Sequence, residues 1–200
     1  MKIYFITGAP GSGKTYVADY IHDRLRTNKP VTHIGADFIR DILRANISPT
    51  DAPALHASSL KTSELAPPDV ADKNAWGYMQ QAQVVINKGI VPAVKRTIEE
   101  NRDLIIEGVN CVPSLLHEAF KDLHNDTVKI ITIVLAVADR ETHLKYLKQQ
   151  NDVDVISKMG KIDTIRHMQA FLVNDGEAAG SYICTGNGIL QKIDEIITHK

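Results

Sequence analysis

The sequence predicts an α/β protein built around a parallel β-sheet, with crossover helices packed against it. Short apolar runs alternate along the 200 residues with stretches of helical periodicity. Hydrophobic residues make up 44% of the chain, which is enough for a sizeable core. No internal repeat or low-complexity tract interrupts the alternation. We therefore expect one domain over residues 1–200, without a linker between independent units.

Five apolar runs are the predicted strands of this sheet. Each is short and rich in β-branched residues, as buried parallel strands are: Lys2–Thr7, Val31–Gly35, Leu104–Glu107, Val128–Val137 and Tyr182–Cys184. Helices are predicted between and after them, over Lys14–Arg26, from Phe38–Leu43 onward, and from an N-cap at Asp139 through Gln150. A last helix has one apolar face formed by Ile189, Ile193, Ile196 and Ile197.

Two regions depart from the plain alternation. Residues 48–74 are rich in Pro, Ser, Asp and Ala and predict an irregular loop, followed by a long helical stretch over 75–101 that is broken near Gly89 and Pro92. Residues 151–161 are charged and lack a clear period, which predicts a mobile segment. Because α/β proteins bind ligands where such insertions follow strands, we expect 48–101 to be an acceptor-binding insertion and 151–161 a lid.

Charge and composition exclude several classes of protein. The net charge is −1, so no overall field draws the chain to nucleic acid or to an anionic membrane. Cys111 and Cys184 lie far apart and form no paired motif, which is typical of a reducing compartment. Met1-Lys2 run straight into an apolar strand, and runs such as Ile130–Val137 are too short to span a bilayer. We expect a cytoplasmic protein without a nucleic-acid or membrane partner.

The first strand leads into a run that fits the phosphate-binding pattern G-x-x-x-x-G-K-[ST] at every fixed position. Glycines let the backbone N–H groups of such a loop approach a phosphate closely, and the following helix adds its partial positive charge. We expect Lys14 to reach the β- and γ-phosphates of ATP and the Thr15 hydroxyl to coordinate Mg²⁺. The loop comprises Gly8, Ala9, Pro10, Gly11, Ser12, Gly13, Lys14 and Thr15.

The rest of the chain favours a kinase among the proteins with this loop. Neither Asn28-Lys29 nor Asn87-Lys88 is followed by the Asp of the guanine motif N-K-x-D, and no ABC-type signature follows. A short chain with a helical insertion and a lid is typical of nucleotide and metabolite kinases. The predicted fold is therefore the three-layer P-loop NTPase fold of that type, with a parallel five-stranded sheet in the order 2-3-1-4-5.

Residues that follow the second and third strands are candidates for the acceptor chemistry. Asp37 comes directly after a strand and can accept the acceptor's proton, or it can simply cap the next helix. Arg40 and Arg44 lie one turn apart on that helix and can grip a phosphate or carboxylate, or they can be solvated. Glu107 ends the third strand and can order the water around Mg²⁺, bind acceptor hydroxyls or be structural.

Cations near the lid are candidates for closing on the phosphates. Each of them is also a plausible solvated charge: Arg140, Lys145, Lys148, Lys158 and Arg166. The eight histidines are scattered and have no metal-ligand spacing, so no protein-borne metal site beyond the magnesium site is expected.

Several segments together resemble the 2-phosphoglycerate kinase family, in family order and over most of the chain. They are Gly35–Arg44, Leu55–Ser59, Gly77–Gln81, Ile105–Pro113 and Ile165–Gln169. The resemblance implies ATP-dependent phosphorylation of the free hydroxyl of 2-phosphoglycerate to give 2,3-bisphosphoglycerate. It also implies a catalytic role for Arg166 beside Lys14 and Asp37, and an acceptor site formed by Arg40, Arg44, His56, Ser58, Ser59, Gln81 and Glu107.

Two other functions stay open at the level of sequence. A nucleoside, nucleotide or sugar-nucleotide kinase, including the toxin-like kinases, has the same loop and the same Asp after the second strand. An ATP-dependent switch or binding module would have the loop with little acceptor chemistry. The oligomeric state has no sequence signal.

Overall fold

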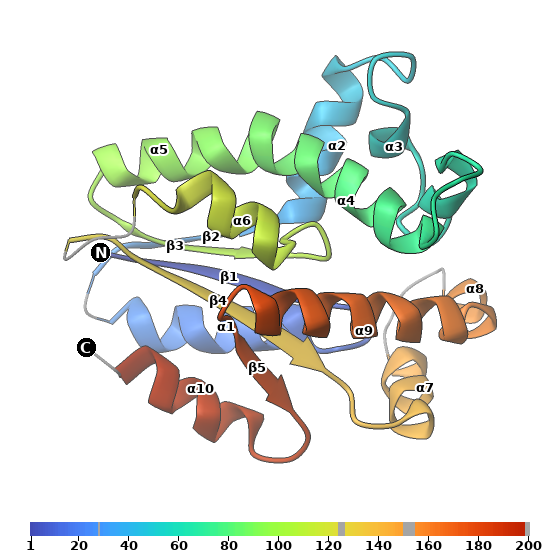
Figure 1. The fold of residues 1–200 in the computed structure, drawn as a ribbon. Coiled ribbons are helices and arrows are strands. Elements are labelled where there is room, and N and C mark those ends of the chain that lie inside the picture. Colours follow the sequence, from blue (N-terminus) through green and yellow to red (C-terminus); the bar gives the residue numbers. More distant parts are fainter. Residues whose placement is uncertain (28, 124–126, 150–154, 199–200) are drawn as a thin grey trace.

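A parallel five-stranded sheet forms the centre of the molecule, as the computed structural model in Figure 1 shows. The structure describes residues 1–27, 29–123, 127–149 and 155–198. The strands are β1 (Lys2–Gly8), β2 (Val31–Gly35), β3 (Asp103–Glu107), β4 (Lys129–Ala136) and β5 (Tyr182–Thr185). Their spatial order is β2-β3-β1-β4-β5, and every pairing is parallel. The predicted α/β class and strand order are confirmed.

The alternation of side chains along β1 separates two hydrophobic cores. Tyr4 and Ile6 pack with the helices α1 (Lys14–Leu25) and α10 (Ile189–Thr198) on one face of the sheet. Ile3 and Phe5 point to the opposite face. The helices on that face are α4 (Lys73–Val85), α5 (Val91–Glu99), α6 (Pro113–Phe120) and α9 (Ile162–Ala178). The result is the predicted three-layer architecture.

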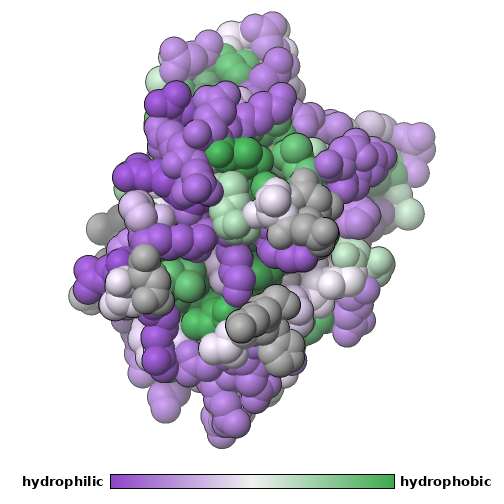
Figure 2. Space-filling model, turned by 90° about the vertical axis from the view of Figure 1, so that its left-hand side faces the viewer, coloured by the Kyte–Doolittle hydropathy of each residue, from purple (hydrophilic) through white to green (hydrophobic). Residues whose placement is uncertain are grey.

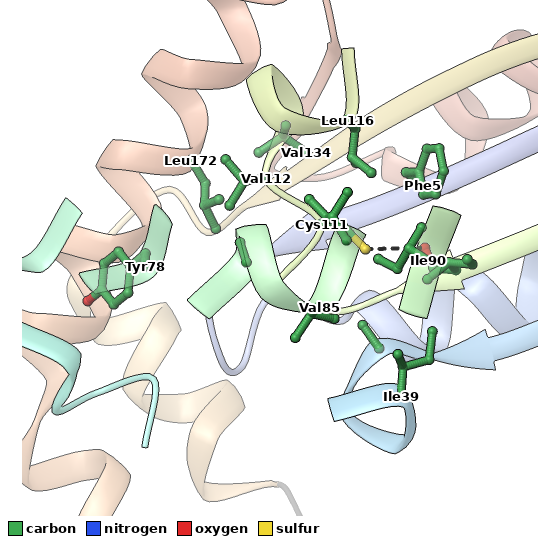
Figure 3. Close-up of a cluster of buried hydrophobic side chains, with 14 of the residues drawn as sticks. Phe5, Ile39, Tyr78, Val85, Ile90, Cys111, Val112, Leu116, Val134 and Leu172 are labelled. Atoms are coloured by element: carbon green, nitrogen blue, oxygen red, sulfur yellow. Dashed lines mark hydrogen bonds between the residues drawn. The ribbon is translucent and has the colours of Figure 1, made fainter. Parts of the chain in front are cut away.

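The larger core joins the segment 48–101 to the sheet. Figure 3 shows Val85 and Ile90 of this segment beside Cys111, with Phe5 and Leu116 close by. The Phe5 and Phe120 rings stack with centroids 5.5 Å apart. Burial of this apolar surface is what fixes the insertion against the rest of the fold.

The segment 48–101 is more regular than its composition predicts. The predicted loop contains α3 (Pro53–His56) and a 3₁₀ turn, η1 (Thr62–Leu65). The predicted break near Gly89 and Pro92 is wrong, because a π-helical turn, η2 (Ile86–Ile90), joins α4 to α5 without interruption. Pro92 is the second residue of α5, which directly follows this turn. Because proline has no N–H to bond to the preceding turn, it fits a place where the regular helical hydrogen-bond pattern is already interrupted. A Cβ on Gly89 would lie 2.1 Å from Ile39 Cγ2, so this glycine lets α2 (Ala36–Asn46) pack closely.

The C-terminal third contains helices that the periodicity did not single out. Residues 155–160 of the predicted mobile segment form α8 (Val155–Gly160), and 151–154 lie outside the described residues. α9 follows with Ile165, Met168 and Leu172 buried at helical spacing. The helix predicted after Asp139 is α7 (Arg140–Lys148), and the Asp139 carboxylate accepts a hydrogen bond from Thr142 N at 2.8 Å, which confirms the N-cap.

The face at the amino ends of the strands is mostly hydrophilic, with apolar residues gathered near its centre (Figure 2). Within the described ranges, no helix is both long and apolar enough to cross a membrane.

Candidate active site

The loop between β1 and α1 has the backbone conformation that its glycines predict. Gly8, Gly11 and Gly13 have φ values of 154°, 84° and 85°, conformations that favour glycine. Gly13 is the N-cap of α1, no side chain caps that helix, and its first turn holds no acidic residue. The free N–H groups at the start of α1 and the helix dipole therefore face the loop and suit a phosphate.

Lys14 points back across this loop. Its ammonium donates a hydrogen bond to Ala9 O at 3.1 Å. Burial lowers the pKa of Lys14, while the nearby carboxylates of Glu107 and Asp37 act to raise it. Both carboxylates line the same cleft as Lys14, so the structure brings three predicted site residues together.

Thr15 and Glu107 place two side-chain oxygens next to each other at the carboxyl ends of the strands. Glu107 ends β3, which pairs with both β1 and β2, so its carboxylate lies between the loop and Gly35. Thr15 Oγ1 donates to Glu107 Oε1 at 3.3 Å. Hydroxyl and carboxylate oxygens beside a phosphate loop are the donor set that Mg²⁺ prefers, so the residues present fit this ion.

Asp37 lies in the first turn of α2 and is not its cap. The N-cap is Gly35, and no side chain caps the helix. The Asp37 side chain is 63% exposed and forms an ion pair with Arg40 Nη2 at 3.1 Å. The capping interpretation of Asp37 is therefore wrong, and the carboxylate is accessible at the mouth of the cleft.

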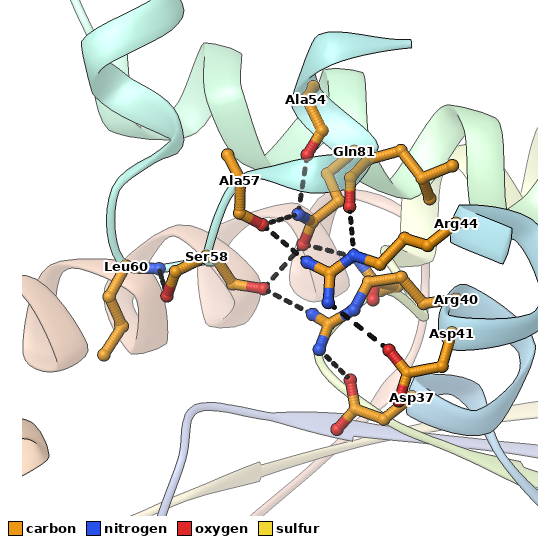
Figure 4. Close-up of polar contacts among 12 residues, drawn as sticks. Asp37, Arg40, Asp41, Arg44, Ala54, Ala57, Ser58, Leu60 and Gln81 are labelled. Carbon is orange, nitrogen blue, oxygen red and sulfur yellow. Dashed lines mark hydrogen bonds and ion pairs between the residues drawn. The ribbon is translucent and has the colours of Figure 1, made fainter. Parts of the chain in front are cut away.

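Arg40 and Arg44 lie on one face of α2, as their spacing predicts, but they make different contacts (Figure 4). Arg40 Nη1 donates to Ser59 Oγ at 3.1 Å, and its buried Nε has no partner among the described residues. Arg44 donates to two backbone carbonyls, Leu55 O within α3 at 2.7 Å and Ala57 O just after it at 2.9 Å. Arg44 therefore fastens the loop to α2.

The residues predicted to surround the acceptor divide into those at the cleft and one behind it. His56, Ser58 and Ser59 line the cleft, and His56 Nε2 also lies 2.8 Å from Ile47 O. Gln81 is only 1% exposed and does not line the cleft, so its side chain cannot contact an acceptor bound there directly. No sequence pattern indicates that Gln81 lies behind the cleft while the other predicted acceptor residues line it.

Arg166 also lies elsewhere than predicted, since it was expected to close on the phosphates. Its guanidinium donates to Val137 O at 2.7 Å and to Ala138 O at 3.3 Å, at the end of β4, and it does not line the cleft. Within the described part of the predicted lid, Ser157, Lys158 and Lys161 line the cleft. Lys161 was not singled out by sequence, although its position at the end of the charged segment was a usable signal.

A buried histidine contacts the backbone of the phosphate loop. His143 of α7 is fully buried, and its Nε2 lies 2.8 Å from Pro10 O. Burial lowers the pKa of His143, and the positive charges of Arg166 and Lys14 act in the same direction. A neutral ring that donates from Nε2 satisfies the Pro10 carbonyl, a contact over 133 residues that no local pattern indicates.

These groups surround one cleft of about 1050 Å³. The phosphate loop forms one wall, α2 and the loop after α3 form another, and α8 closes a third side. Five cationic side chains line it, against the two carboxylates of Asp37 and Glu107: Lys14, Arg40, Arg44, Lys158 and Lys161. The cleft suits a polyanion next to a second, anionic molecule.

Comparison with known proteins finds a matching family model and several similar proteins. The zeta toxin family model matches residues 2–151. The chain is 27% identical over 203 residues to a 2-phosphoglycerate kinase of Methanopyrus kandleri, covering 98% of this chain and 60% of that protein. It is 30% identical over 141 residues to a 2-phosphoglycerate kinase of Methanocaldococcus jannaschii, covering 70% and 43%. The chain thus spans about half the length of these relatives.

A solved structure supports the fold. A shikimate kinase from Acinetobacter baumannii, in complex with shikimate, superposes with a TM-score of 0.53 at 15% identity, over 98% of this chain and 92% of that chain.

Proposed function

Since the chain belongs to the zeta toxin family and has a P-loop kinase fold, we propose that it transfers the γ-phosphate of ATP to a hydroxyl of a small anionic acceptor. The acceptor that we propose first is 2-phosphoglycerate, which would give 2,3-bisphosphoglycerate. One observation carries the proposal: Arg40 and two lysines of the proposed lid, Lys158 and Lys161, line the same cleft as the phosphate loop. The names of the relatives agree with this acceptor.

The reaction needs little covalent chemistry from the protein. The acceptor oxygen forms a bond to the γ-phosphorus while the bond from that phosphorus to the bridging oxygen breaks, and ADP leaves with the electron pair. Asp37 takes the hydroxyl proton, because its carboxylate is exposed at the cleft. Lys14 holds the β- and γ-phosphates. Thr15, with Glu107 beside it, would hold Mg²⁺, and the bound ion would neutralise charge on the phosphates.

The cleft lining supports a small acid over a nucleoside. No Phe, Tyr or Trp is among the described residues that line the cleft. The aromatic ring among them is the imidazole of His56, whose Nε2 already lies 2.8 Å from Ile47 O, so a base would find little surface on which to stack. Cationic side chains and the hydroxyl of Ser58 suit a phosphate and a carboxylate instead.

A sugar-nucleotide acceptor is the second candidate. The volume of about 1050 Å³ leaves room beyond ATP phosphates and a three-carbon acid, and the matching family model is that of zeta toxins. Under either candidate, residues 48–101 are the acceptor-binding insertion and 151–161 the lid. Contacts of Arg40 with Ser59, and Lys158 and Lys161 at the cleft, support these assignments.

An ADP-release assay with a panel of acceptors tests the proposal. The panel comprises 2- and 3-phosphoglycerate, nucleosides and uridine diphosphate sugars, each with Mg-ATP. We expect the highest kcat/KM with 2-phosphoglycerate. Turnover with a sugar nucleotide alone would favour the second candidate. ATP hydrolysis that no acceptor changes would instead identify a switch protein and refute both.

A further inference from the structure

The buried side chain of Gln81 on α4 makes four hydrogen bonds close to the cleft, although it does not line the cleft. Its Nε2 donates to two backbone carbonyls, Ala54 O at 2.8 Å and Ala57 O at 2.9 Å (Figure 4). Carbonyl oxygens can only accept, so the amide nitrogen has to face them. The orientation of the Gln81 amide is therefore fixed, and its Oε1 faces the other way.

This orientation determines the hydrogen bonds on the other side. Gln81 Oε1 accepts from Asn110 Nδ2 at 3.1 Å and from Ser59 Oγ at 2.6 Å. Ser59 has one hydroxyl proton, and it is used in this bond. Toward Arg40, Ser59 Oγ can then only accept, and it does so from Nη1 at 3.1 Å. Arg40 Nη2 in turn holds Asp37 at 3.1 Å.

We infer that Gln81 is a positioning residue, which sets the direction of the Ser59 hydroxyl and thereby holds the Arg40 guanidinium beside Asp37 at the acceptor end of the cleft. The inference rests on the proposed function and assigns different roles to two residues of the same site. Ser59 binds the arginine and has no proton left to donate to the acceptor. Arg40 is the group that meets the anion.

These hydrogen bonds join four segments that are separate in the sequence. Asn110 belongs to the loop after Glu107, Gln81 to α4, Ser59 to the loop after α3, and Arg40 to α2. Both Gln81 and Asn110 are nearly fully buried, at 1% and 2% exposed. Because water has little access to these groups, it cannot replace a hydrogen bond that is lost there. Loss of the Gln81 amide should therefore disturb the Ser59 hydroxyl and, through it, the Arg40 guanidinium.

Steady-state kinetics of Gln81→Met measure this effect. Methionine keeps the length of the side chain and removes all four hydrogen bonds. We expect the KM for the acceptor to rise about tenfold, with the KM for ATP unchanged. Gln83→Met is the matched control, because Gln83 is exposed on the same helix, and it should leave both constants unchanged. Equal changes in both KM values of Gln81→Met would overturn the inference.

A double-mutant cycle with Arg40→Ala tests whether Gln81 acts through the arginine. If it does, adding Gln81→Met to Arg40→Ala raises the acceptor KM no further. A second increase of similar size would mean that Gln81 acts independently, and the inference would be wrong. Ser59→Ala removes only one hydroxyl and should raise the acceptor KM as much as Gln81→Met does. If the methionine variant does not fold, Ser59→Ala takes its place in the cycle with Arg40→Ala.

A spectroscopic readout separates this inference from the proposed function. The Nε–Hε signal of Arg40, assigned by its loss in Arg40→Lys, should be sharp in the wild type because the guanidinium is held at two points. We expect it to broaden or shift in Gln81→Met and Ser59→Ala and to stay in place in Gln83→Met. An unchanged signal in both former variants refutes the positioning role, whichever acceptor proves active.

Discussion

The two ends of the cleft are built in different ways. The phosphate end is one run of eight residues, 8–15, whose binding groups are mainly backbone N–H groups and one ammonium. The proposed acceptor end is assembled from side chains of α2, the loop after α3, α4 and the loop after β3, joined by hydrogen bonds. A contiguous loop is fixed by local conformation, whereas the acceptor end exists only after the insertion has packed.

This difference predicts how each end responds to substitution. At the phosphate end, loss of one charged group removes a contact that no neighbour replaces. At the acceptor end, neighbouring arginines on one helix have separate tasks, so the same substitution has different consequences one turn apart.

Lys14→Ala should have the largest effect. The γ-phosphate loses its main cation, so we expect kcat to fall about 10³-fold while the fold is retained. ATP turnover with the preferred acceptor and the far-ultraviolet circular dichroism spectrum are the measurements. A loss of less than about tenfold would mean that Lys14 mainly supports the loop through Ala9 O.

Asp37→Asn should lower kcat by about 10²-fold, because the amide cannot accept the hydroxyl proton. The affinity for ATP, measured by calorimetry, should be retained. Asp41→Asn is a suitable comparison, since Asp41 forms the equivalent ion pair with Arg44 one turn further along α2. An unchanged kcat in Asp37→Asn would leave Asp37 only the role of holding Arg40.

Arg40→Ala and Arg44→Ala should separate binding from stability. Arg40→Ala should raise the acceptor KM about tenfold with little change in thermal stability. Arg44→Ala removes two bonds to backbone carbonyls and should lower the free energy of unfolding by about 1–3 kcal/mol. The same shift in acceptor KM for both variants, without loss of stability, would mean that Arg44 also binds the acceptor.

His143→Gln should have the smallest effect, visible in the pH dependence of stability. Burial lowers the pKa of His143 below its ordinary 6.5, so the folded protein binds fewer protons here than the unfolded chain. The free energy of unfolding should therefore fall as the pH drops below 6.5 toward the lowered value. Urea titrations at pH 5 and 8 should give a smaller difference for the variant than for the wild type. An equal difference would exclude His143 as a contributor.

The amino-acid sequence by itself determined the class, the strand order and the phosphate loop. The class and the loop follow from local information: apolar runs of strand length, glycines at positions that need positive φ, and a lysine and threonine at fixed spacing after them. The strand order follows from the P-loop kinase fold that the loop indicates. Glu107 and Asp37 were also found this way, because parallel strands end at one edge of a sheet.

Only the tertiary structure decided which polar side chains meet. Gln81 bonds Asn110 across 29 residues, and His143 reaches Pro10 across 133, at distances that no periodicity encodes. The π-helical turn at 86–90 and the separate tasks of Arg40 and Arg44 depend likewise on packing against α2 and α3. Local sequence sets backbone preferences, but the partner of a buried polar group is chosen by whatever the folded chain brings within hydrogen-bonding distance.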